Sequence, residues 1–302
     1  MSDRNRIFGI FAALFAGIIW GFLGPFVRGL DEAGITPLQL THLRYVVATV
    51  ILGVYLLVFH RDRFRIDRRT LVMVIAMGVF GTAMNSTCYF GSMTLISLSL
   101  STVLQYISPF IVVVFSVPLF GERMTLKKAV AVMIAFLGCI LCTGLLTDPG
   151  TMNLTGILLG TMSGFCFAFY TLGSKDLARH SVHPVTVLFY TSLICCLVLL
   201  PFSDYPSIIT SVNSSDSVIP LVIATGVLLT LLPFGLYNYA MGKIEAGLAA
   251  IITYIEPLTS TLVGLVFYSE AVTLEIAVGI IIILVAVFMV NRNGDVKIDV
   301  EK

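Results

Sequence analysis

The sequence predicts an all-α integral membrane protein whose ten transmembrane helices form two inverted five-helix repeats around a central cavity. Of 302 residues, 58% are hydrophobic and 12% are charged, and the mean hydropathy is +1.00. A soluble domain has roughly 25% charged residues. A helix needs about 20 mainly apolar residues to cross a bilayer. The segments that meet this requirement are 7–28, 37–59, 70–91, 98–120, 125–146, 153–174, 184–202, 217–241, 246–269 and 273–291.

The second half of the chain repeats the first at an offset of 148 residues. The segment 106–109 (YISP) matches 254–257 (YIEP), and Glu122 matches Glu270. We therefore predict two repeats of five spans each, residues 1–148 and 149–302. Because five is odd, the repeats must enter the bilayer from opposite sides. Many secondary transporters are built in this way, with a binding site near the midplane.

The basic residues indicate how the chain crosses the membrane, because lysine and arginine gather on the cytoplasmic side. With a cytoplasmic N-terminus, all but two of the 18 Lys and Arg residues fall in cytoplasmic loops or tails. The exceptions are Arg28 at the outer side and Arg44 within the second span. We expect a multi-pass protein of the inner (plasma) membrane with both termini in the cytoplasm.

Several chemistries are excluded or not expected. All six cysteines fall within spans, so no disulfide framework is expected. Cys139 and Cys142 have the spacing of a redox or zinc pair, but they lie in an apolar helix without a nearby histidine and are interpreted as packing residues. No G-x-x-x-x-G-K-[ST] loop occurs in the sequence, which excludes ATP-driven pumping by this polypeptide alone. No cofactor, metal or nucleic acid is expected.

A polar face on the ninth span predicts the cavity. Thr253, Glu256 and Ser260 recur at helical spacing, which places them on one side of the helix. The same face of the fourth span, 148 residues earlier, carries Gln105 and Ser108. Polar side chains in a membrane face other helices or water, so we expect both faces to line one cavity. Close packing of helices through small residues is the alternative.

Two charged residues within the spans are candidates for binding. Glu256 is the one carboxylate deep inside a span, and a charge there costs at least about 2.5 kcal/mol. It could exchange a proton or hold an ammonium group, or it could be a structural carboxyl. Arg44 is the one cation within a span; it could attract a carboxylate, or it could extend toward the outer interface.

Aromatic and amide side chains within the spans are predicted to form two layers that shape and gate the cavity. Pro109 and Pro257, at matching positions, remove backbone donors and are predicted to kink their helices. Lipid-facing or packing roles are the alternative for each aromatic residue. The outer layer is Trp20, Asn85 and Tyr106; the inner layer is Tyr170, Tyr190, Tyr237, Asn238 and Tyr254; Phe167 is the equivalent of Trp20.

With these features the chain resembles the EamA-type branch of the drug/metabolite transporter superfamily over nearly its whole length. The resemblance implies ten helices around a central cavity, cytoplasmic termini and export of amino acids or related metabolites. Ser269 departs from the glycine that is usual before the last glutamate, and no residue pattern identifies a substrate. The resemblance rests on Trp20-Gly21, Pro37, Arg44-Tyr45, Pro109, Gly121-Glu122, Glu256-Pro257 and Ser269-Glu270.

These observations together predict a secondary transporter and not an enzyme. By alternating access it would export small metabolites, with amino acids as the leading candidates, and proton coupling is left open. Its partners would be a small-molecule substrate and the lipid bilayer, and a monomer would suffice because two halves build a complete pathway. The alternatives are a uniporter or importer of another solute, a membrane transferase using Asp176, His180 and His183, and a sensor that does not transport.

Overall fold

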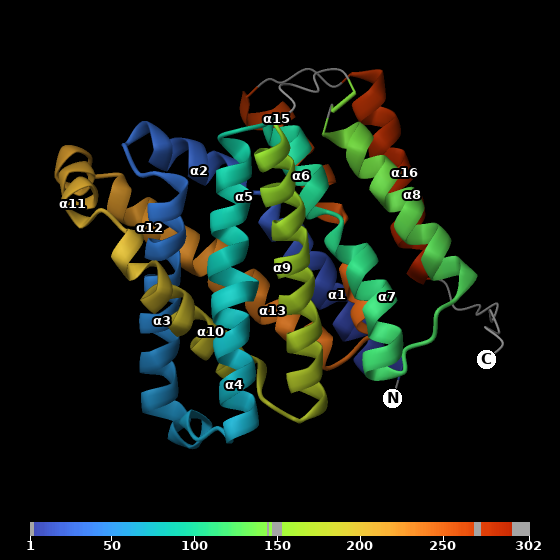
Figure 1. Ribbon diagram of the computed structural model, residues 1–302, viewed down its shortest axis with the longest axis horizontal. Helices are drawn as coiled ribbons and strands as arrows, with labels where there is room; N and C mark the ends of the chain where they lie inside the picture. Colours follow the sequence, from blue (N-terminus) through green and yellow to red (C-terminus); the bar gives the residue numbers. More distant parts are fainter. Residues whose placement is uncertain (1–2, 144, 147–152, 269–272, 292–302) are drawn as a thin grey trace.

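The structure is a computed structural model that describes residues 3–143, 145–146, 153–268 and 273–291. These residues form a bundle of helices and contain no strand, which confirms the all-helical membrane fold (Figure 1). Ser269 and Glu270 lie outside the described residues. Within the described ranges, eight helical segments are long and apolar enough to cross a bilayer: Arg4–Glu32, Pro37–Phe59, Arg68–Met93, Leu98–Phe120, Leu154–Arg179, Pro184–Phe202, Val218–Met241 and Ala246–Phe267.

Two further apolar helices complete the bundle. Helix α8 (Leu126–Cys142) has 17 residues, and α16 (Leu274–Asn291) includes the apolar stretch Leu274–Met289. They pack along each other at one side of the bundle (Figure 1). Length and composition therefore identify eight spans, and the count of ten stays a prediction that depends on these two helices.

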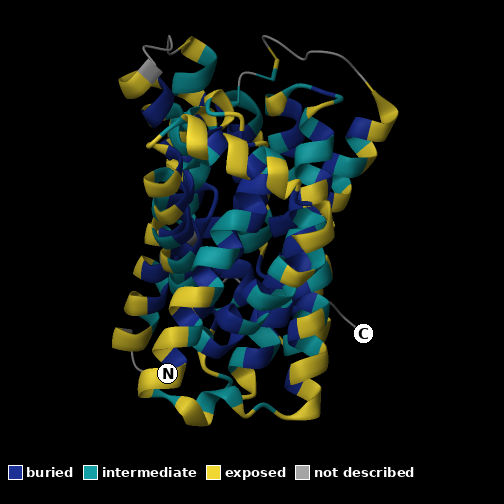
Figure 2. Ribbon diagram, turned by 90° about the vertical axis from the view of Figure 1, so that its left-hand side faces the viewer, coloured by how far each residue is buried: buried dark blue, intermediate teal, exposed yellow. Residues whose placement is uncertain are grey.

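The surface of the bundle is suited to lipid. Phe11, Val54 and Leu158 are among many large apolar side chains that are more than half exposed, at 51%, 56% and 62%. Exposed residues follow the outward faces of the helices, whereas buried residues run down the middle (Figure 2). A soluble protein rarely exposes apolar patches of this extent, so a hydrocarbon environment explains this surface.

Three of the spans are broken near their middle. The first consists of α1 (Asp3–Trp20) and α2 (Leu23–Glu32). The fourth and ninth are broken at equivalent places, and Pro109 and Pro257 lie in the first turn of the helices that follow the breaks. Proline is tolerated there because the first-turn amides have no partner within the helix. The bounds are α6 (Leu98–Gln105), α7 (Ser108–Phe120), α14 (Ala246–Ile252) and α15 (Ile255–Tyr268).

A second irregularity also recurs in both halves. The third span contains a π-helical segment, η2 (Met77–Met84), and the eighth contains another, η4 (Val227–Leu231), at the equivalent place. Segments of this kind are rare in helices, so their recurrence supports the duplication. The flanking helices are α4 (Arg68–Ala76), α5 (Asn85–Met93), α12 (Val218–Gly226) and α13 (Leu232–Met241).

Equivalent contacts confirm that the repeats are related in three dimensions. A Cβ atom at Gly9 of α1 would lie 2.7 Å from Cβ of Lys243, and a Cβ atom at Gly156 would lie 2.8 Å from Cγ2 of Ile96 and 2.9 Å from Cβ of Leu95. Gly156 begins α9 (Leu154–Arg179), at the equivalent place to Gly9. In each repeat, therefore, the start of the first helix packs against the loop that precedes the broken span of the other repeat.

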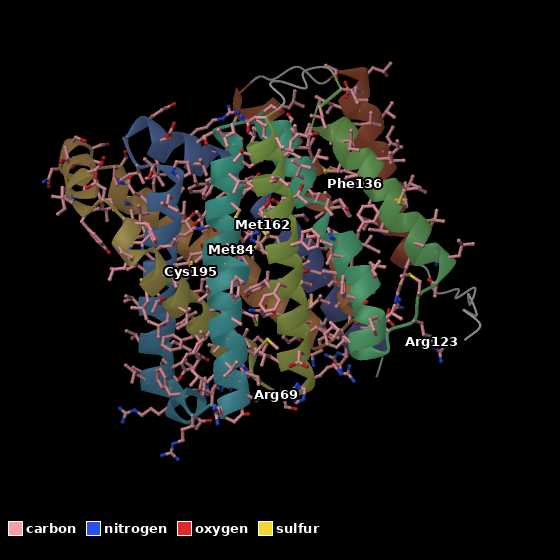
Figure 3. The ribbon with its side chains drawn as sticks, viewed as in Figure 1. Arg69, Met84, Arg123, Phe136, Met162 and Cys195 are labelled. Carbon is pink, nitrogen blue, oxygen red and sulfur yellow. The ribbon has the colours of Figure 1, made fainter. Side chains whose placement is uncertain are left out.

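Two arginines mark one end of the bundle. Arg69 and Arg123 lie at the end where the chain begins, and we call this the N-terminal end and the opposite one the far end (Figure 3).

Polar side chains begin several of the helices: Thr125 caps α8 and His183 caps α10. The remaining elements are α3 (Pro37–Phe59), η1 (Arg61–Phe64), α10 (Pro184–Leu199), η3 (Leu200–Phe202) and α11 (Tyr205–Ser214).

Candidate functional site

A cavity of about 430 Å³ lies between the two halves, in the far half of the bundle. Its wall comes from α1, α2, α5, α6 and α15, together with the start of α3 at Pro37 and the far ends of α8 and α16. Side chains from both repeats contribute, as the duplication predicts. The polar and charged residues of the wall are Arg28, Tyr89, Ser99, Thr102, Tyr106, Thr143, Glu256, Ser260 and Thr261.

Glu256 brings a carboxyl group into the cavity wall at the break between α14 and α15. Among the residues that the structure describes, none forms an ion pair with it. The Tyr106 hydroxyl is near enough to interact with this carboxyl, and it makes no close hydrogen bond to any other group in the described structure. A carboxyl and an unsatisfied hydroxyl thus meet in one wall, where a polar ligand could bind both.

An aromatic layer closes the cavity toward the N-terminal end. Trp20 lies in the wall, and its ring makes edge-on contacts with Phe167, Phe234 and Tyr237 at centroid distances of 5.9, 5.1 and 5.4 Å. These contacts join the outer and inner layers that the sequence predicts as separate gates. The two layers are therefore in direct contact here, and together they form one floor.

Tyr106 and Tyr254 add a second part to this floor. Their rings stack with a centroid distance of 5.3 Å and an interplanar angle of 25°. The Tyr254 hydroxyl donates a 2.7 Å hydrogen bond to the Tyr106 carbonyl. Pro109 has no backbone N–H that could donate to a carbonyl of the preceding turn. Carbonyl groups at the break of the fourth span are therefore available as acceptors, and the Tyr106 carbonyl is one of them.

Tyr170 and Asn238 lie below the floor and bind each other. The Tyr170 hydroxyl donates to Oδ1 of Asn238 at 3.2 Å, and Nδ2 of Asn238 lies 3.0 Å from the same hydroxyl. Ser174 donates to the amide oxygen at 2.9 Å. Both residues are buried, so they stabilise the packing of α9 against α13 and do not reach the cavity.

Gln105 does not line the cavity, and the polar face of the fourth span to which it belongs packs against other helices. A Cβ atom at Gly164 of α9 would lie 3.1 Å from the Gln105 carbonyl oxygen. Ser101, one turn earlier, exchanges a 2.9 Å hydrogen bond with Ser92 of α5. The packing alternative therefore describes this face, because α6 turns its smaller side chains toward α5 and α9.

Three other predicted residues lie away from the cavity wall. Nδ2 of Asn85 donates to the Ser163 carbonyl at 2.8 Å, and the Tyr190 hydroxyl donates to the Phe64 carbonyl at 2.8 Å near the N-terminal end. The Arg44 guanidinium lies over the Tyr45 ring, 5.4 Å from its centroid. Of the predicted residues, Trp20, Tyr106, Glu256 and Pro257 line the cavity.

The structure adds residues that the sequence reasoning did not choose. Ser99 and Thr102 line the cavity from the same face of α6 that leads to the predicted Tyr106, and this spacing of three and four residues was visible in the sequence. The Tyr89 hydroxyl shares a 2.9 Å hydrogen bond with Thr102. Arg28 lies in the wall, where the sequence reasoning considered Arg44 for the cationic role.

The N-terminal end is closed around the turn that joins α13 to α14. Nζ of Lys175 donates to the carbonyls of Met241 and Ile244 at 2.9 and 2.6 Å. The Glu122 carboxylate accepts hydrogen bonds from the amides of Ala246 and Gly247 at 2.6 and 3.2 Å. An ion pair between Lys128 and Glu245 adds a third contact.

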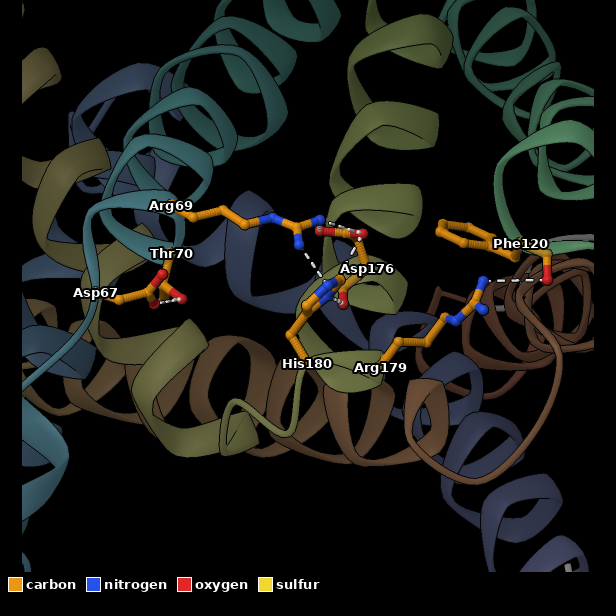
Figure 4. A network of polar contacts seen from close by, with 7 residues as sticks. All are labelled: Asp67, Arg69, Thr70, Phe120, Asp176, Arg179 and His180. Atoms are coloured by element: carbon orange, nitrogen blue, oxygen red, sulfur yellow. Dashed lines mark hydrogen bonds and ion pairs between the residues drawn. The ribbon is translucent and has the colours of Figure 1, made fainter.

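A polar network lies at the surface of the same end (Figure 4). Arg69 of α4 binds Asp176 at 3.1 Å and also contacts His180. These are two of the residues on which a transferase would have to rely, and here they connect α4 to α9. The remaining contacts of the network join the Thr70 hydroxyl to Asp67 and Arg179 to the Phe120 carbonyl.

No group of three or more His, Cys, Asp or Glu side chains that could hold a metal occurs in the described ranges. Cys142 lies in the cavity wall, and its thiol contacts the Ile276 carbonyl at 3.9 Å. Cys139 is fully buried. Cys139 thus has the packing environment expected of a small apolar side chain, whereas Cys142 faces the cavity.

Known proteins resemble this chain over most of its length. An uncharacterised transporter of Archaeoglobus fulgidus is 26% identical over 259 residues, which cover 86% of this chain and 90% of the relative. The uncharacterised inner membrane transporter YicL of Salmonella typhimurium is 27% identical and covers 95% of this chain and 96% of its own length. The threonine/homoserine exporter RhtA of Escherichia coli K12 is 29% identical, with coverages of 77% and 74%.

A protein of known crystal structure has the same fold. It superposes with a TM-score of 0.77 at 20% identity and covers 96% of this chain and 97% of its own. The EamA-like transporter family matches residues 7–144 and again residues 154–292, one match to each predicted repeat. With both halves matched, the chain belongs to the EamA-like transporter family.

Proposed function

We propose that this membrane transporter exports small zwitterionic metabolites, with amino acids as the first candidates, from the cytoplasm by alternating access. The observation that carries the proposal is the cavity of about 430 Å³, which has Glu256 in its wall and an aromatic layer as its floor. The size falls in the range of small-molecule sites, roughly 300–1,000 Å³. The relative named as a threonine/homoserine exporter supports the substrate class.

The direction in which the cavity faces follows from the proposed orientation. Arg69 and Arg123 mark the N-terminal end as basic (Figure 3), and basic loops favour the cytoplasm. The N-terminal end would then be cytoplasmic and closed, and the cavity would belong to the outer half. The structure would represent the outward-facing state, in which an exporter releases its substrate.

The wall of the cavity has the chemistry to bind an amino acid. The Glu256 carboxylate could hold the substrate ammonium group. Hydroxyl groups of Tyr106, Thr102 and Ser260 could bind polar atoms of the substrate, and each neutral hydrogen bond would contribute about 1 kcal/mol. Trp20 would pack against an apolar side chain. We propose no direct role for Arg44, which lies outside the wall.

Glu256 is also the group through which a proton could be exchanged. If substrate ammonium and proton compete for one carboxylate, release of the substrate outside allows a proton to bind, and the loaded carboxyl returns inward. This cycle is proton antiport. A Glu256→Gln variant cannot exchange a proton at this site, so its substrate counterflow would lose its dependence on an imposed pH gradient.

The substrate is identified first, by thermal unfolding of the purified protein with a panel of amino acids, amines and sugars. A ligand that binds the folded state raises the melting temperature by mass action. Flux of that ligand is then measured in proteoliposomes for the wild type, Glu256→Gln and the control Asp204→Asn, which changes a carboxylate at the start of α11. Binding without counterflow would indicate a sensor. Unchanged pH dependence in Glu256→Gln would exclude Glu256 as the proton-exchanging group, and a wild-type flux that does not respond to the pH gradient would indicate a facilitative mechanism.

Both repeats of one chain contribute residues to the cavity wall, as two halves that build one pathway would. We therefore propose that a monomer is sufficient for transport. Light scattering of the purified protein, combined with flux at one chain per vesicle, would show whether a second copy is required.

A further inference from the structure

The closed end of the bundle depends on a lysine that reaches across from another helix. Lys175 lies near the end of α9, and its Nζ atom donates to two carbonyls, Met241 at 2.9 Å and Ile244 at 2.6 Å. Met241 ends α13, so its carbonyl lies at the negative end of a helix dipole. One cation thus holds both sides of the turn that precedes the broken ninth span.

The same turn has an equivalent at the far end. Met93 and Ile96, which lie 148 residues before Met241 and Ile244, form the turn before the broken fourth span. The start of α9 packs against this turn through Gly156. In the same way, the start of α1 packs through Gly9 against the turn between Met241 and Ile244. The two turns are therefore equivalent in their surroundings as well as in sequence.

Lys175 has an equivalent too, which is Arg28. The offset of 147 residues that relates them also relates Gly9 to Gly156, Gly17 to Gly164 and Trp20 to Phe167. Of the 18 Lys and Arg residues in the sequence, only this pair occupies equivalent positions in the two repeats. No other pair of equivalent positions has a basic residue in both repeats. The recurrence at Arg28 and Lys175 therefore indicates a shared role.

We propose that Lys175 and Arg28 are alternate latches: Lys175 closes the cytoplasmic end in the outward-facing state, and Arg28 closes the outer end in the inward-facing state. In that second state the Arg28 guanidinium donates to the carbonyls of Met93 and Ile96, and Lys175 releases Met241 and Ile244. In this structure Arg28 and Met93 both line the open cavity. The inference rests on the alternating access of the proposed function.

The arrangement would keep the free energies of the outward-facing and inward-facing states similar. A conformational equilibrium shifts only by the difference in free energy between its states. When one charge-assisted contact forms as its equivalent breaks, the loss at one end is offset at the other, and neither state is trapped. Each cation is a positioning residue for the gate, and neither needs to touch the substrate.

The test uses two reporter cysteines, one for each state, in a Cys142→Ser background because Cys142 itself lines the cavity. Ser260→Cys is in the cavity wall and exposed, so a membrane-impermeant maleimide labels it from outside in the outward-facing state. Ala249→Cys, on α14, is fully buried here and would be labelled from the cytoplasmic side in the inward-facing state. The same background without a reporter corrects for the other cysteines.

Lys175→Met should slow labelling of Ser260→Cys and speed labelling of Ala249→Cys, and Arg28→Met should do the reverse. We expect the ratio of the two rates to shift by roughly tenfold in each direction, because each change removes charge-assisted hydrogen bonds from one state. Lys175→Arg and Arg28→Lys, which keep a donor, should stay near the parent ratio. The exposed, cytoplasmic-end Arg65→Met controls for loss of a charge.

Shifts of the same sign, or no shift in Arg28→Met, would overturn the proposal. Arg28 is exposed, so its variant remains informative even if Lys175→Met does not fold. Failure of the latches is distinguishable from failure of alternating access. In the second case, Ala249→Cys of the parent protein would stay unlabelled from the cytoplasmic side under every substrate condition.

Discussion

The hydroxyl of Tyr254 donates a 2.7 Å hydrogen bond to the carbonyl of Tyr106, the residue that occupies the equivalent place in the other repeat. The two rings stack at the centre of the bundle, between the broken spans. No matching hydrogen bond runs from the Tyr106 hydroxyl to the Tyr254 carbonyl in the described structure. Two equivalent residues therefore have unequal surroundings, which shows that the repeats differ in conformation at their point of contact.

This inequality predicts different effects for two matched substitutions. Tyr254→Phe leaves the Tyr106 carbonyl without its donor and should destabilise the protein by about 1 kcal/mol. Tyr106→Phe removes a hydroxyl that makes no close hydrogen bond in the described structure, so it should destabilise the protein less than Tyr254→Phe does. Thermal unfolding in one detergent measures both. Equal losses would contradict the asymmetry seen in the structure.

Glu122 should contribute more to stability than the partly exposed ion pair beside it, between Lys128 and Glu245. Its buried carboxylate accepts two amide hydrogen bonds, from Ala246 and Gly247, and bonds to a charged group contribute roughly 1.5–3 kcal/mol. Glu122→Ala should therefore lower the melting temperature clearly. Glu245→Gln, which breaks the partly exposed pair with Lys128, should change stability by less than about 1 kcal/mol. The reverse order of the two variants in the same unfolding assay would refute this.

His183 should make the stability of the N-terminal end depend on pH. Burial lowers the pKa of this histidine below 6.5, and the nearby Arg63 and His60 lower it further. Nδ1 of His183 accepts a 3.2 Å hydrogen bond from the Val185 amide at the start of α10. A histidine with a lowered pKa binds protons more readily when unfolded. Its contribution is therefore complete above about pH 6.5 and is lost as the pH falls through the folded pKa.

The matched variant is His183→Asn, which retains a capping side chain and does not titrate. Melting temperatures at pH 8 and pH 5.5 should fall less for this variant than for the wild type. At pH 8 the two proteins should unfold at nearly the same temperature. An identical fall in both would exclude His183 as a source of the pH dependence.

Filling the cavity should abolish binding without loss of the fold. Ser260 is exposed in the wall, so Ser260→Trp places a large ring in the space where the substrate would lie. We expect the ligand-induced rise in melting temperature to disappear, because the occupied volume is no longer accessible. Ser260→Ala keeps the space and should retain most of the rise. A ligand response that survives in Ser260→Trp would place the site elsewhere.

Properties that depend on local pattern could be predicted from the sequence. Hydropathy indicates a membrane protein, and the repeated YISP and YIEP segments indicate a duplication that recurs in the broken spans and the π-helical segments. Trp20, Tyr106 and Glu256 were chosen because large polar or aromatic groups within a span need a reason, and all three line the cavity.

The sequence could not predict which of two similar polar faces on one helix lines the cavity. Helix α6 carries two polar faces, one with Ser101 and Gln105 and one with Ser99 and Thr102. The second lines the cavity because the first packs against α5 and α9. Helix periodicity identifies both faces, but the rotation of α6 about its axis depends on contacts with helices distant in sequence.

By itself, then, the sequence determined the environment of this protein, its duplication and the candidate groups at the breaks, because hydrophobicity and spacing act over a few turns of helix. Only the tertiary structure decided that Arg28 and not Arg44 enters the wall, and that the end held by Lys175 is the closed one. The physical reason is that two nearly equivalent repeats can close at either end, and which end is closed depends on the sum of many contacts between helices.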